Sequence, residues 1–564
     1  MQKEFLITEQ MKLNYKKKIK FIFFDEYIQS FYDREKLDKL DFSTFYSFKD
    51  LAKINYNSKI LHKKIRIYRS ELTKTLNMIH RTRFGEKYWG LIIDQLTYII
   101  VNSIIIELSL LKNIFKSNKD ILLFKVNFKN FYLDTIDFLN SHAFDNRQAF
   151  TRYIIAKKIG FKIENFKVEK SVQGHNRNKF SERLHIKILR LIFRNYVKLY
   201  KPKLILDSYL GKINDLKIFF KSFGKICSIP SNFFFNYRYN NIKKDIKKRN
   251  KIKVSEIDLI DEIFNVLIKE FIPASYVENF QKYHLESKKF SFLKMIGTAV
   301  SSVSDDHFKY LSAEVLKNQG KLIVLQHGAL TKKVKYNFEA FSNEKYASKC
   351  FYWKDKEIFH ENYFSKFNKY NLLNNEKYEE ILIYPTTHQL KTYYKFPPLK
   401  KYHLKLNLNY KFYENLNNNL KNKVKIKLFP DITSNLFISN WKKKYNKNHF
   451  IDNKKNLFNF FKITIIDDVS TALCELLYVE APFILIDDEF LTLKSETYKK
   501  IIKLKKLNVL FQDPTEAAHF LNKNYDNIEK WWDSVKKKKI FKEVKKYMIP
   551  DFSKKIKFKD KIKI

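Results

Sequence analysis

The sequence is poor in glycine, proline and cysteine, and it has no arginine after Arg249. Its 9 glycines among 564 residues lie far below the usual share of about 7%. Three widely spaced cysteines, Cys227, Cys350 and Cys474, exclude a disulfide scaffold and a CxxC-type zinc site. A reducing cytosol is the simplest compartment for such a chain, so we expect a cytoplasmic protein. Because glycine and proline are rare, each one carries more positional information than usual.

Positive charge dominates the composition. Lys and Arg number 109 against 60 Asp and Glu, which gives a formal net charge of +49, and only 13 of the basic residues are arginine. A protein selected to grip nucleic acid is expected to favour arginine, whose planar fork matches phosphate. Lys, Asn, Ile, Phe and Tyr are enriched together, as drift toward A+T-rich codons produces. We therefore expect most of the charge on solvated faces, with an anionic partner as the alternative.

Hydrophobic residues make up 45% of the chain, which excludes disorder as a whole and allows a large core. The best membrane candidate, residues 91–111, is interrupted by Asp94 and Glu107. Its uncharged run is about 12 residues, whereas a span needs about 20, so we predict a buried helix. The N-terminus has no apolar core of signal-peptide type. The Lys-rich end, residues 536–564, is the favoured patch for an anionic membrane surface, and a frayed tail is the alternative.

Short apolar runs alternate with helical patterns, which predicts an α/β fold with parallel sheets. In the first half we expect a strand at 20–24, a long helical stretch at 36–117 and a mostly helical, basic region at 150–200. The Lys/Asn-rich run at 238–253 is expected to be an exposed excursion, and a helix is expected at 274–281.

The clearest unit is a helix at 308–319, stopped by Gly320 and followed by a buried strand at 321–326. A second α/β zone begins after a break near 347–353. Trp531 and Trp532 are expected to pack the C-terminal helix against the rest. The second zone has predicted strands at 380–384, 423–429, 463–466, 483–486 and 508–511, with helices at 471–479 and 515–522 among them.

Ligands collect at the carboxyl ends of strands in open α/β sheets, so residues that follow a predicted strand are the first candidates. His327 and Gly328 follow the strand at 321–326. A histidine there can act as a general base or donate to a phosphate, and Gly328 lets the backbone turn sharply. An ordinary loop histidine is the alternative.

The segment DDVST, residues 467–471, follows another predicted strand and enters a helix. Ser470 and Thr471 can cap the first amides of that helix, and the same amides bind phosphate well. Glu475 stands one turn further, on the ligand-facing side, where it can accept hydrogen bonds from ribose or sugar hydroxyls. Plain capping with a surface glutamate is the alternative.

The acidic runs at 487–489 and 305–307 resemble metal sites only weakly. The chain contains no P-loop, no GxGxxG fingerprint, no HExxH motif and no nucleophile elbow. We therefore predict no metal and no cofactor.

Several segments, in order along almost the whole chain, carry a resemblance. They are FLIT (5–8), LNMIH (76–80), EKYWGLIID (86–94), LILDSYL (204–210), IPASYVENF (272–280), VLQHG (324–328), Glu344-x-x-Ala347 with Trp353, DDVSTALCELLYVEAPFI (467–484), and Trp531-Trp532. Together they resemble a bacterial family of transferases found among surface-carbohydrate biosynthesis genes. That family is distantly similar to CDP-glycerol glycerophosphotransferases and other GT-B-type glycosyltransferases. Two departures stand out: Ala329-Leu330-Thr331 replaces a Gly-rich stretch, and Lys427 stands where the family usually has arginine.

The resemblance implies two Rossmann-like domains in a GT-B-type arrangement, with a helix-rich N-terminal part and a cleft between the domains. The implied division is an acceptor domain at 1–347, a nucleotide-donor domain at 348–546 and a basic tail at 547–564. The resemblance carries His327 and Glu344 over as catalytic residues. It carries over Lys427, Ser470, Thr471 and Glu475 as donor-binding residues.

The implied reaction is metal-independent transfer of a sugar or polyol-phosphate group from a nucleotide-activated donor to a glycan or lipid-linked acceptor, in cell-surface polysaccharide biosynthesis. The implied location is cytoplasmic, with peripheral contact at the inner face of the plasma membrane left open. A specific nucleic-acid partner is not expected. The rival hypotheses are a non-enzymatic basic binder of nucleic acid or anionic membrane, and a degenerate transferase fold kept as an assembly partner.

Overall fold

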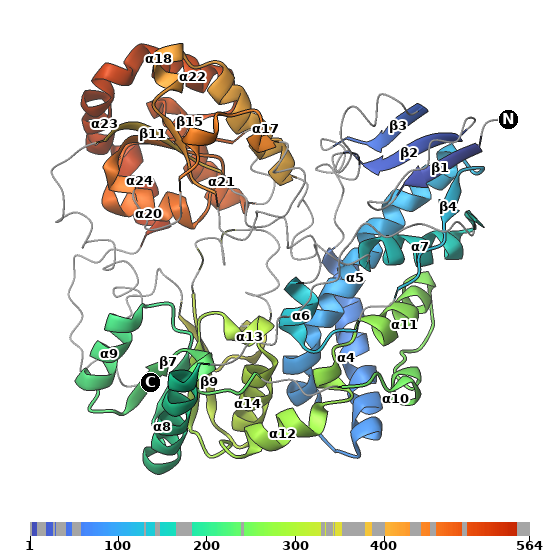
Figure 1. Ribbon diagram of the computed structural model, residues 1–564. Coiled ribbons are helices and arrows are strands. Elements are labelled where there is room, and N and C mark those ends of the chain that lie inside the picture. Colours follow the sequence, from blue (N-terminus) through green and yellow to red (C-terminus); the bar gives the residue numbers. More distant parts are fainter. Residues whose placement is uncertain are drawn as a thin grey trace.

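The computed structural model describes residues 3–7, 19–25, 29, 41–47, 58–128, 131–140, 147–164, 183–237, 242–326, 328, 333, 342, 344–351, 378–385, 401–428, 441–451, 458–487 and 493–549. Within this part of the chain the named strands form three five-stranded sheets, and all their pairs are parallel (Figure 1). The predicted α/β class with parallel sheets is therefore confirmed. There are three sheets, however, where the sequence indicated two α/β zones.

The first sheet has the strand order β3-β2-β1-β4-β5. The predicted strand at 20–24 is confirmed as β2. The expectation of a continuous helical stretch from residue 36 is wrong at its start, because Asp41–Tyr46 forms β3 and its aromatic residues and threonine favour a strand. The elements are β1 (Lys3–Ile7), β2 (Ile19–Asp25), β3 (Asp41–Tyr46), β4 (Leu122–Phe124) and β5 (Lys162–Glu164), with helices α4 (Ser58–His80), α5 (Glu86–Ser117), α6 (Thr135–Asn140) and α7 (Arg147–Ile159).

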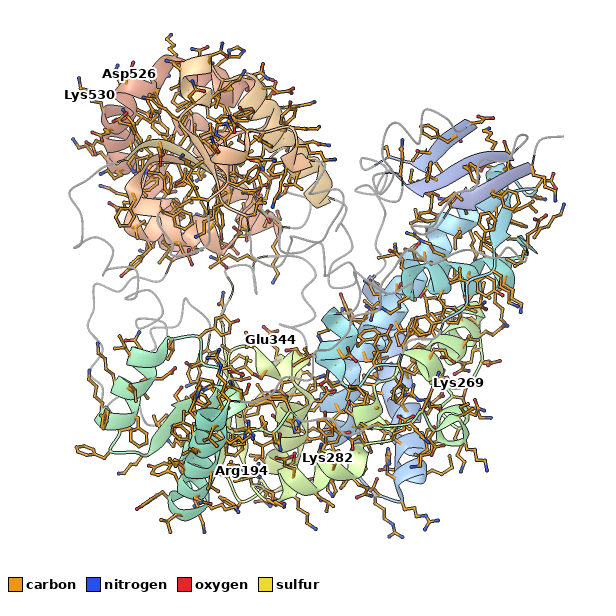
Figure 2. The ribbon with its side chains drawn as sticks, viewed as in Figure 1. Arg194, Lys269, Lys282, Glu344, Asp526 and Lys530 are labelled. Carbon is orange, nitrogen blue, oxygen red and sulfur yellow. The ribbon has the colours of Figure 1, made fainter. Side chains whose placement is uncertain are left out.

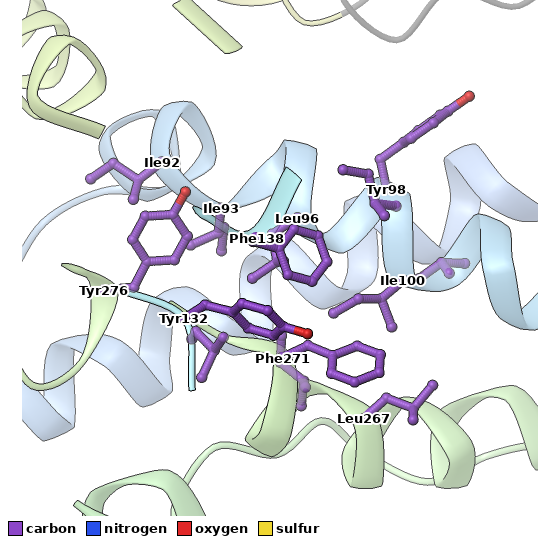
Figure 3. Close-up of a cluster of buried hydrophobic side chains, with 14 of the residues drawn as sticks. Ile92, Ile93, Leu96, Tyr98, Ile100, Tyr132, Phe138, Leu267, Phe271 and Tyr276 are labelled. Carbon is purple, nitrogen blue, oxygen red and sulfur yellow. The ribbon is translucent and has the colours of Figure 1, made fainter. Parts of the chain in front are cut away.

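Helix α5 is the core element of the N-terminal part. It packs against α4, α7, α11 and α14, and Figure 3 shows its Ile92, Ile93 and Leu96 among aromatic side chains from other elements. It is the one helix in the described chain long and apolar enough to cross a membrane, and 89% of its most apolar window is buried inside the protein. The prediction of a buried helix at 91–111 is therefore confirmed.

The second sheet has the order β10-β9-β8-β6-β7. Numbered in chain order and read from the β7 edge, this is 2-1-3-4-5, a doubly wound topology. The helix at 308–319 and the strand at 321–326 are confirmed as α14 and β9. The predicted domain boundary after residue 347 falls just before β10, which pairs with β9. The elements are β6 (Lys203–Leu206), β7 (Ile226–Ile229), β8 (Met295–Thr298), β9 (Lys321–Leu325) and β10 (Lys349–Phe351), α8 (Leu184–Tyr200), α9 (Lys212–Lys221), α10 (Ile246–Asn250), α11 (Leu259–Phe271), α12 (Phe280–Lys288), α13 (Ser301–Ser304) and α14 (Asp306–Lys317), and the 3-10 turns η2 (Ser231–Phe233) and η3 (Ala274–Tyr276).

Two predictions in this region are corrected. Arg249, at the end of the run expected to be exposed, is buried, and its Nε donates to Glu278 Oε1 at 2.6 Å. The helix expected at 274–281 is instead the short turn η3 followed by α12, because Ala274 O accepts from Val277 N and Asn279 N, three and five residues on, which is not the α-helical pattern.

The third sheet repeats the doubly wound order, as β12-β11-β13-β14-β15. Five strands and two helices are found where this zone predicted them, but the strands predicted at 423–429 and 508–511 are shorter, Val424–Ile426 and Leu510–Phe511, and residue 429 lies outside the described residues. One face of the sheet packs on α17 and α22 and the other on α20 and α24. The elements are β11 (Tyr378–Tyr384), β12 (Val424–Ile426), β13 (Phe461–Ile466), β14 (Phe483–Ile486) and β15 (Leu510–Phe511), α17 (Lys401–Glu414), α18 (Asn418–Lys421), α20 (Thr471–Val479), α21 (Ser495–Ile501), α22 (Pro514–Asn524), α23 (Ile528–Lys537) and α24 (Lys539–Met548), and η6 (Lys447–His449), η7 (Phe458–Phe460), η8 (Ile502–Leu507) and η9 (Tyr525–Asn527).

The tryptophan pair fixes the end of the chain, as predicted. Trp532 is buried, its Nε1 donates to Glu480 O at 2.6 Å, and its ring meets Phe483 of β14 and Phe541 of α24 at 5.2 and 5.3 Å. It therefore joins α23, α24 and the sheet.

Left-handed backbone positions, which usually favour glycine, are held here by other residues. Lys201 (φ 46) follows α8, Glu480 (φ 53) follows α20, and Asn508 (φ 54) follows η8. Asp207 (φ 51) and Tyr209 (φ 60) form the turn after β6. The low glycine content therefore means that residues with side chains occupy backbone positions that usually favour glycine.

Segments singled out by the resemblance meet in the core. Asn77 Oδ1 accepts from Trp89 Nε1 and from Phe84 N, both at 3.0 Å, which fixes the turn between α4 and α5. His80 Nε2 donates to Tyr276 O at 2.9 Å, and its ring stacks on Phe280 at 4.0 Å. The segments at 76–80, 86–94 and 272–280 are therefore packing elements that join α4, α5 and α12.

Burial holds the pKa of His80 down, at about 4, against about 6.5 in an unfolded chain. The neutral ring thus stabilises the fold above pH 6.5, and this contribution is lost as the pH falls toward 4. Between pH 7 and pH 5 we expect His80 to account for a loss of roughly 1–2 kcal/mol in the free energy of unfolding. His80→Phe keeps the stack and does not titrate, so its urea-unfolding midpoint should fall less over this pH range than that of the wild type. His519→Phe, at an exposed position of α22, should keep the wild-type pH dependence; an equally steep fall in His80→Phe would refute the assignment.

Candidate functional site

The carboxyl edge of the third sheet brings three chain segments into one row. Strand registers pair Ile383 with Ile426 and Tyr384 with Ile466, so Lys427, Tyr384 and Asp467 stand at adjacent strand ends. The main chain continues this pairing, since Lys427 N donates to Ile383 O at 3.0 Å. The strand order reverses between β11 and β13, which is where ligands bind in doubly wound sheets.

Lys427 and Glu475 interact electrostatically at this switch point. Both side chains are buried, Lys427 after β12 and Glu475 on α20. Burial lowers the pKa of Lys427, and the charge of Glu475 partly opposes that shift. Burial and the same glutamate raise the pKa of Tyr384 to about 12, and Lys427 Nζ lies 5.7 Å from the Tyr384 ring centre. Two of the predicted donor-binding residues are therefore brought together, with Tyr384 as a third member that sequence reasoning missed.

Helix α20 begins at this edge with both predicted hydroxyl residues. Ser470 is its N-cap and Thr471 its first residue, and both are half-buried. The expected capping is wrong for Ser470, because its side chain makes no capping hydrogen bond. A helix start leaves its first amides without intrahelical partners and carries partial positive charge. The arrangement at this end of α20 thus suits an anionic group.

A buried lysine stands beside this helix start. Lys405 of α17 has its Nζ 2.7 Å from Asp468 Oδ1 and 3.8 Å from Asp487 Oδ2. One turn on, Asn409 Nδ2 donates to Asp467 Oδ2 at 2.6 Å. Burial lowers the pKa of Lys405, but these three carboxylates outweigh it and hold the pKa above its ordinary value. Lys405 is therefore a charged ammonium that offsets part of their negative charge.

Sequence reasoning missed Lys405 and Asn409. The sequence shows only that these two polar residues are four positions apart, and so lie on one face of a helix. Their carboxylate partners lie roughly 60 or more residues further along the chain. Nothing in a single sequence assigns such partners.

The two weak metal candidates have structural roles where they are described. Asp487 pairs with Lys405, and residues 488 and 489 lie outside the described residues. Asp305 caps α14 through His307 N at 2.9 Å, and Asp306 accepts from Thr135 Oγ1 at 2.6 Å. Over the described ranges, no group of three or more His, Cys, Asp or Glu side chains is placed to hold a metal ion.

The two predicted catalytic residues, His327 and Glu344, come between β9 and β10 of the second sheet in the chain. Gln326 follows β9, and its Nε2 donates to Gly328 O at 2.6 Å. His327 itself lies outside the described residues. Glu344 is exposed (Figure 2), and the chain beside it is tied down because Lys345 Nζ lies 3.5 Å from Asp94 Oδ2 and the Tyr346 hydroxyl donates to the same oxygen.

Asp207, in the segment LILDSYL, organises the switch point of the second sheet. Its Oδ1 accepts from Ser231 N at 2.9 Å and its Oδ2 from Ser301 Oγ at 2.6 Å. These bonds join the loops after β6, β7 and β8. The sequence marked this segment only by resemblance, and the structure gives Asp207 a positioning role.

The buried charge group at the third sheet yields a stability prediction. Lys405→Met removes the ammonium and leaves the buried Asp487 and the half-buried Asp468 without it. Breaking a buried ion pair from one side costs about 3–5 kcal/mol. We expect a markedly lower thermal unfolding midpoint, measured by differential scanning calorimetry. Lys411→Met, at an exposed position of the same helix, is the matched control and should unfold as the wild type does; a wild-type midpoint for Lys405→Met would show that the pair is not needed.

Comparison with known proteins identifies the family. Neither a search of curated proteins nor a search of solved structures found a match. A family described as "LIC12162 family transferase" matches residues 4–551. This range contains the described parts of all three sheets except the first residue of β1, and the chain therefore belongs to the LIC12162 family of transferases.

Proposed function

We propose that this transferase moves a sugar or polyol-phosphate group from a nucleotide-activated donor to an acceptor hydroxyl in cell-surface polysaccharide biosynthesis. The observation that carries the proposal is the meeting of Lys427, Glu475 and the start of α20 at the switch point of the third sheet. Membership of a transferase family supports an enzyme over a non-enzymatic basic binder.

The donor lies at the third sheet in this proposal. Its pyrophosphate accepts hydrogen bonds from the first amides of α20 and from the Ser470 and Thr471 hydroxyls. Lys427 adds positive charge, and because burial has already lowered its pKa, a neighbouring anion strengthens the charged form. Glu475 accepts a hydrogen bond from a donor hydroxyl. The nucleotide phosphate is the leaving group, and fixed donors that stabilise its charge supply most of the catalysis.

The acceptor lies at the second sheet. The acceptor oxygen forms a bond to the transferred carbon or phosphorus, the bond from that atom to the nucleotide phosphate breaks, and His327 takes the hydroxyl proton. Glu344 is the second catalytic residue on the acceptor side in this proposal. The nucleotide phosphate leaves with the electron pair of the broken bond.

A GT-B-type arrangement, with the two carboxyl edges facing one cleft, completes the proposal. Its support is Lys333, six residues after His327. Lys333 Nζ donates to Tyr547 O and Met548 O, both at 3.1 Å, and Lys333 O accepts from Lys494 N at 2.9 Å. The chain after β9 thus reaches α21 and α24 of the C-terminal part.

A thermal-shift screen with CDP, UDP, dTDP, GDP and CMP at two salt concentrations tests the donor site. We expect one nucleotide to stabilise the protein selectively, by about 2.7 kcal/mol at 100 times its Kd. Lys427→Met should lose this stabilisation, because the buried ammonium no longer faces the phosphate. Lys425→Met is the matched control on β12, since its Nζ lies 3.4 Å from Glu380 Oε1, and it should keep the response.

The screen separates the competing hypotheses. If every polyanion stabilised the protein to the same extent and high salt abolished the effect, the binding would be non-specific and the donor-site proposal would be wrong. The same nucleotide response in Lys427→Met and in the wild type would place the donor elsewhere.

A second variant tests the base. We expect His327→Ala to abolish transfer, followed as release of the nucleotide found in the screen, while the thermal shift with that nucleotide stays unchanged. Loss of both would assign His327 to the donor site, and retained transfer would remove it from the mechanism.

A further inference from the structure

Helix α8 turns an apolar stripe to solvent. Leu184, Ile188, Leu191, Ile192 and Leu199 are each between 50% and 71% exposed. Their spacings of four, seven, eight and fifteen residues from the first place them on one face, within an arc of about 100°. Large exposed apolar patches on proteins mark contact surfaces.

Helix α9, which follows β6, adds to this surface. Ile213, Leu216 and Phe220 are between 56% and 69% exposed, and Phe223 just beyond the helix is 93% exposed. The two helices lie next to one another beside the edge strand β7 (Figure 1), and the rings of Tyr196 and Phe219 meet at 5.5 Å. We call the exposed apolar residues of α8, α9 and Phe223 the α8–α9 face.

The opposite side of α8 is fixed to the protein, so the stripe is not a misplaced core face. Arg190 Nη2 donates to Asn232 O at 3.0 Å, and Arg194 (Figure 2) pairs with Glu286 at 2.7 Å. Val197 on the same side is fully buried. The helix therefore already has its packing partners and keeps a second apolar side for another surface.

The exposed charged residues that α8 and α9 themselves contribute are basic. Exposed basic residues flank the stripe on α8 at Lys187 and Lys198 and continue on α9 at Lys217. Asp207 and Asp215 are the only acids in residues 183–225, and both are engaged. Asp207 accepts from Ser231 and Ser301, and Asp215 accepts from Ser208 Oγ and Ser228 Oγ at 2.6 Å.

We propose that the α8–α9 face docks on the surface of an anionic lipid bilayer. Aliphatic and phenyl side chains enter the boundary between headgroups and acyl chains, while the flanking lysines meet anionic headgroups. A second copy of the chain would place like charges against one another, and a nucleic-acid backbone offers nothing to the exposed leucine and isoleucine side chains. The proposal is independent of the transfer reaction and differs in place from the Lys-rich end at 536–564.

Sedimentation of the full chain with vesicles tests the proposal. We expect binding to vesicles of phosphatidylcholine with about 30% phosphatidylglycerol, weaker binding at high salt, and little binding to phosphatidylcholine alone. The double variant Leu191→Glu/Phe220→Glu puts two carboxylates into the face at exposed positions. Its partition to anionic vesicles should fall at least about tenfold, while its thermal midpoint stays that of the wild type.

The matched control is Ile246→Glu/Ile257→Glu, which changes two residues that are 64% and 80% exposed outside the face and should leave vesicle binding unchanged. Three results would overturn the proposal. One is equal binding by Leu191→Glu/Phe220→Glu and the wild type. Another is binding lost in Lys536→Glu/Lys537→Glu but kept in Leu191→Glu/Phe220→Glu. The third is no vesicle binding together with self-association, seen by analytical ultracentrifugation, that Leu191→Glu/Phe220→Glu abolishes.

Discussion

The buried carboxylate of Asp94 is the contact on which the N-terminal architecture depends. Arg69 of α4 donates to both of its oxygens, from Nε at 2.8 Å to Oδ1 and from Nη2 to Oδ2, and the Tyr346 hydroxyl donates as well. A buried charge is tolerated only when it is paired and hydrogen-bonded. This single group therefore joins α4, the core helix α5 and the segment that leads into β10. Gly90 completes the joint, since a methyl group there would collide with the Tyr346 hydroxyl.

The two doubly wound sheets then use one principle for different tasks. At the second sheet, Asp207 joins the loops at the strand ends by accepting hydrogen bonds from Ser231 N and Ser301 Oγ, which are uncharged. The candidate base, His327, comes after β9 in the chain. At the third sheet the strand ends carry charge, with Lys427 beside Glu475 and Lys405 among aspartates. In the proposed reaction this division matches the chemistry, because the donor is anionic and the acceptor is a hydroxyl. Lys333, which follows β9 in the chain, donates a hydrogen bond to the main chain of α24 in the C-terminal part.

The sequence was most informative where apolar runs are bounded by turn residues. Gly320 and Pro482 each precede a predicted strand that the structure confirms, and the start of α20 was predicted at Thr471. The short strands β1 and β5 were missed because three to five residues give little periodicity. Lys405 was missed because its partners are distant in sequence. From the sequence alone, the exposed apolar stripe on α8 could not be distinguished from a face that packs on the core. Periodicity shows that one face of a helix is apolar, but it does not show what covers that face.

The left-handed positions held by Lys201, Glu480 and Asn508 bear on how this chain tolerates its own composition. Each non-glycine residue in that region costs roughly 1–2 kcal/mol relative to right-handed backbone, with asparagine the mildest case. The fold carries these costs at the ends of α8, α20 and η8. Glycine in place of Lys201 or Glu480 would remove this cost and add stability with no change in topology. The free energy of unfolding of this fold can therefore be increased at backbone positions, without any change to the side chains of its core.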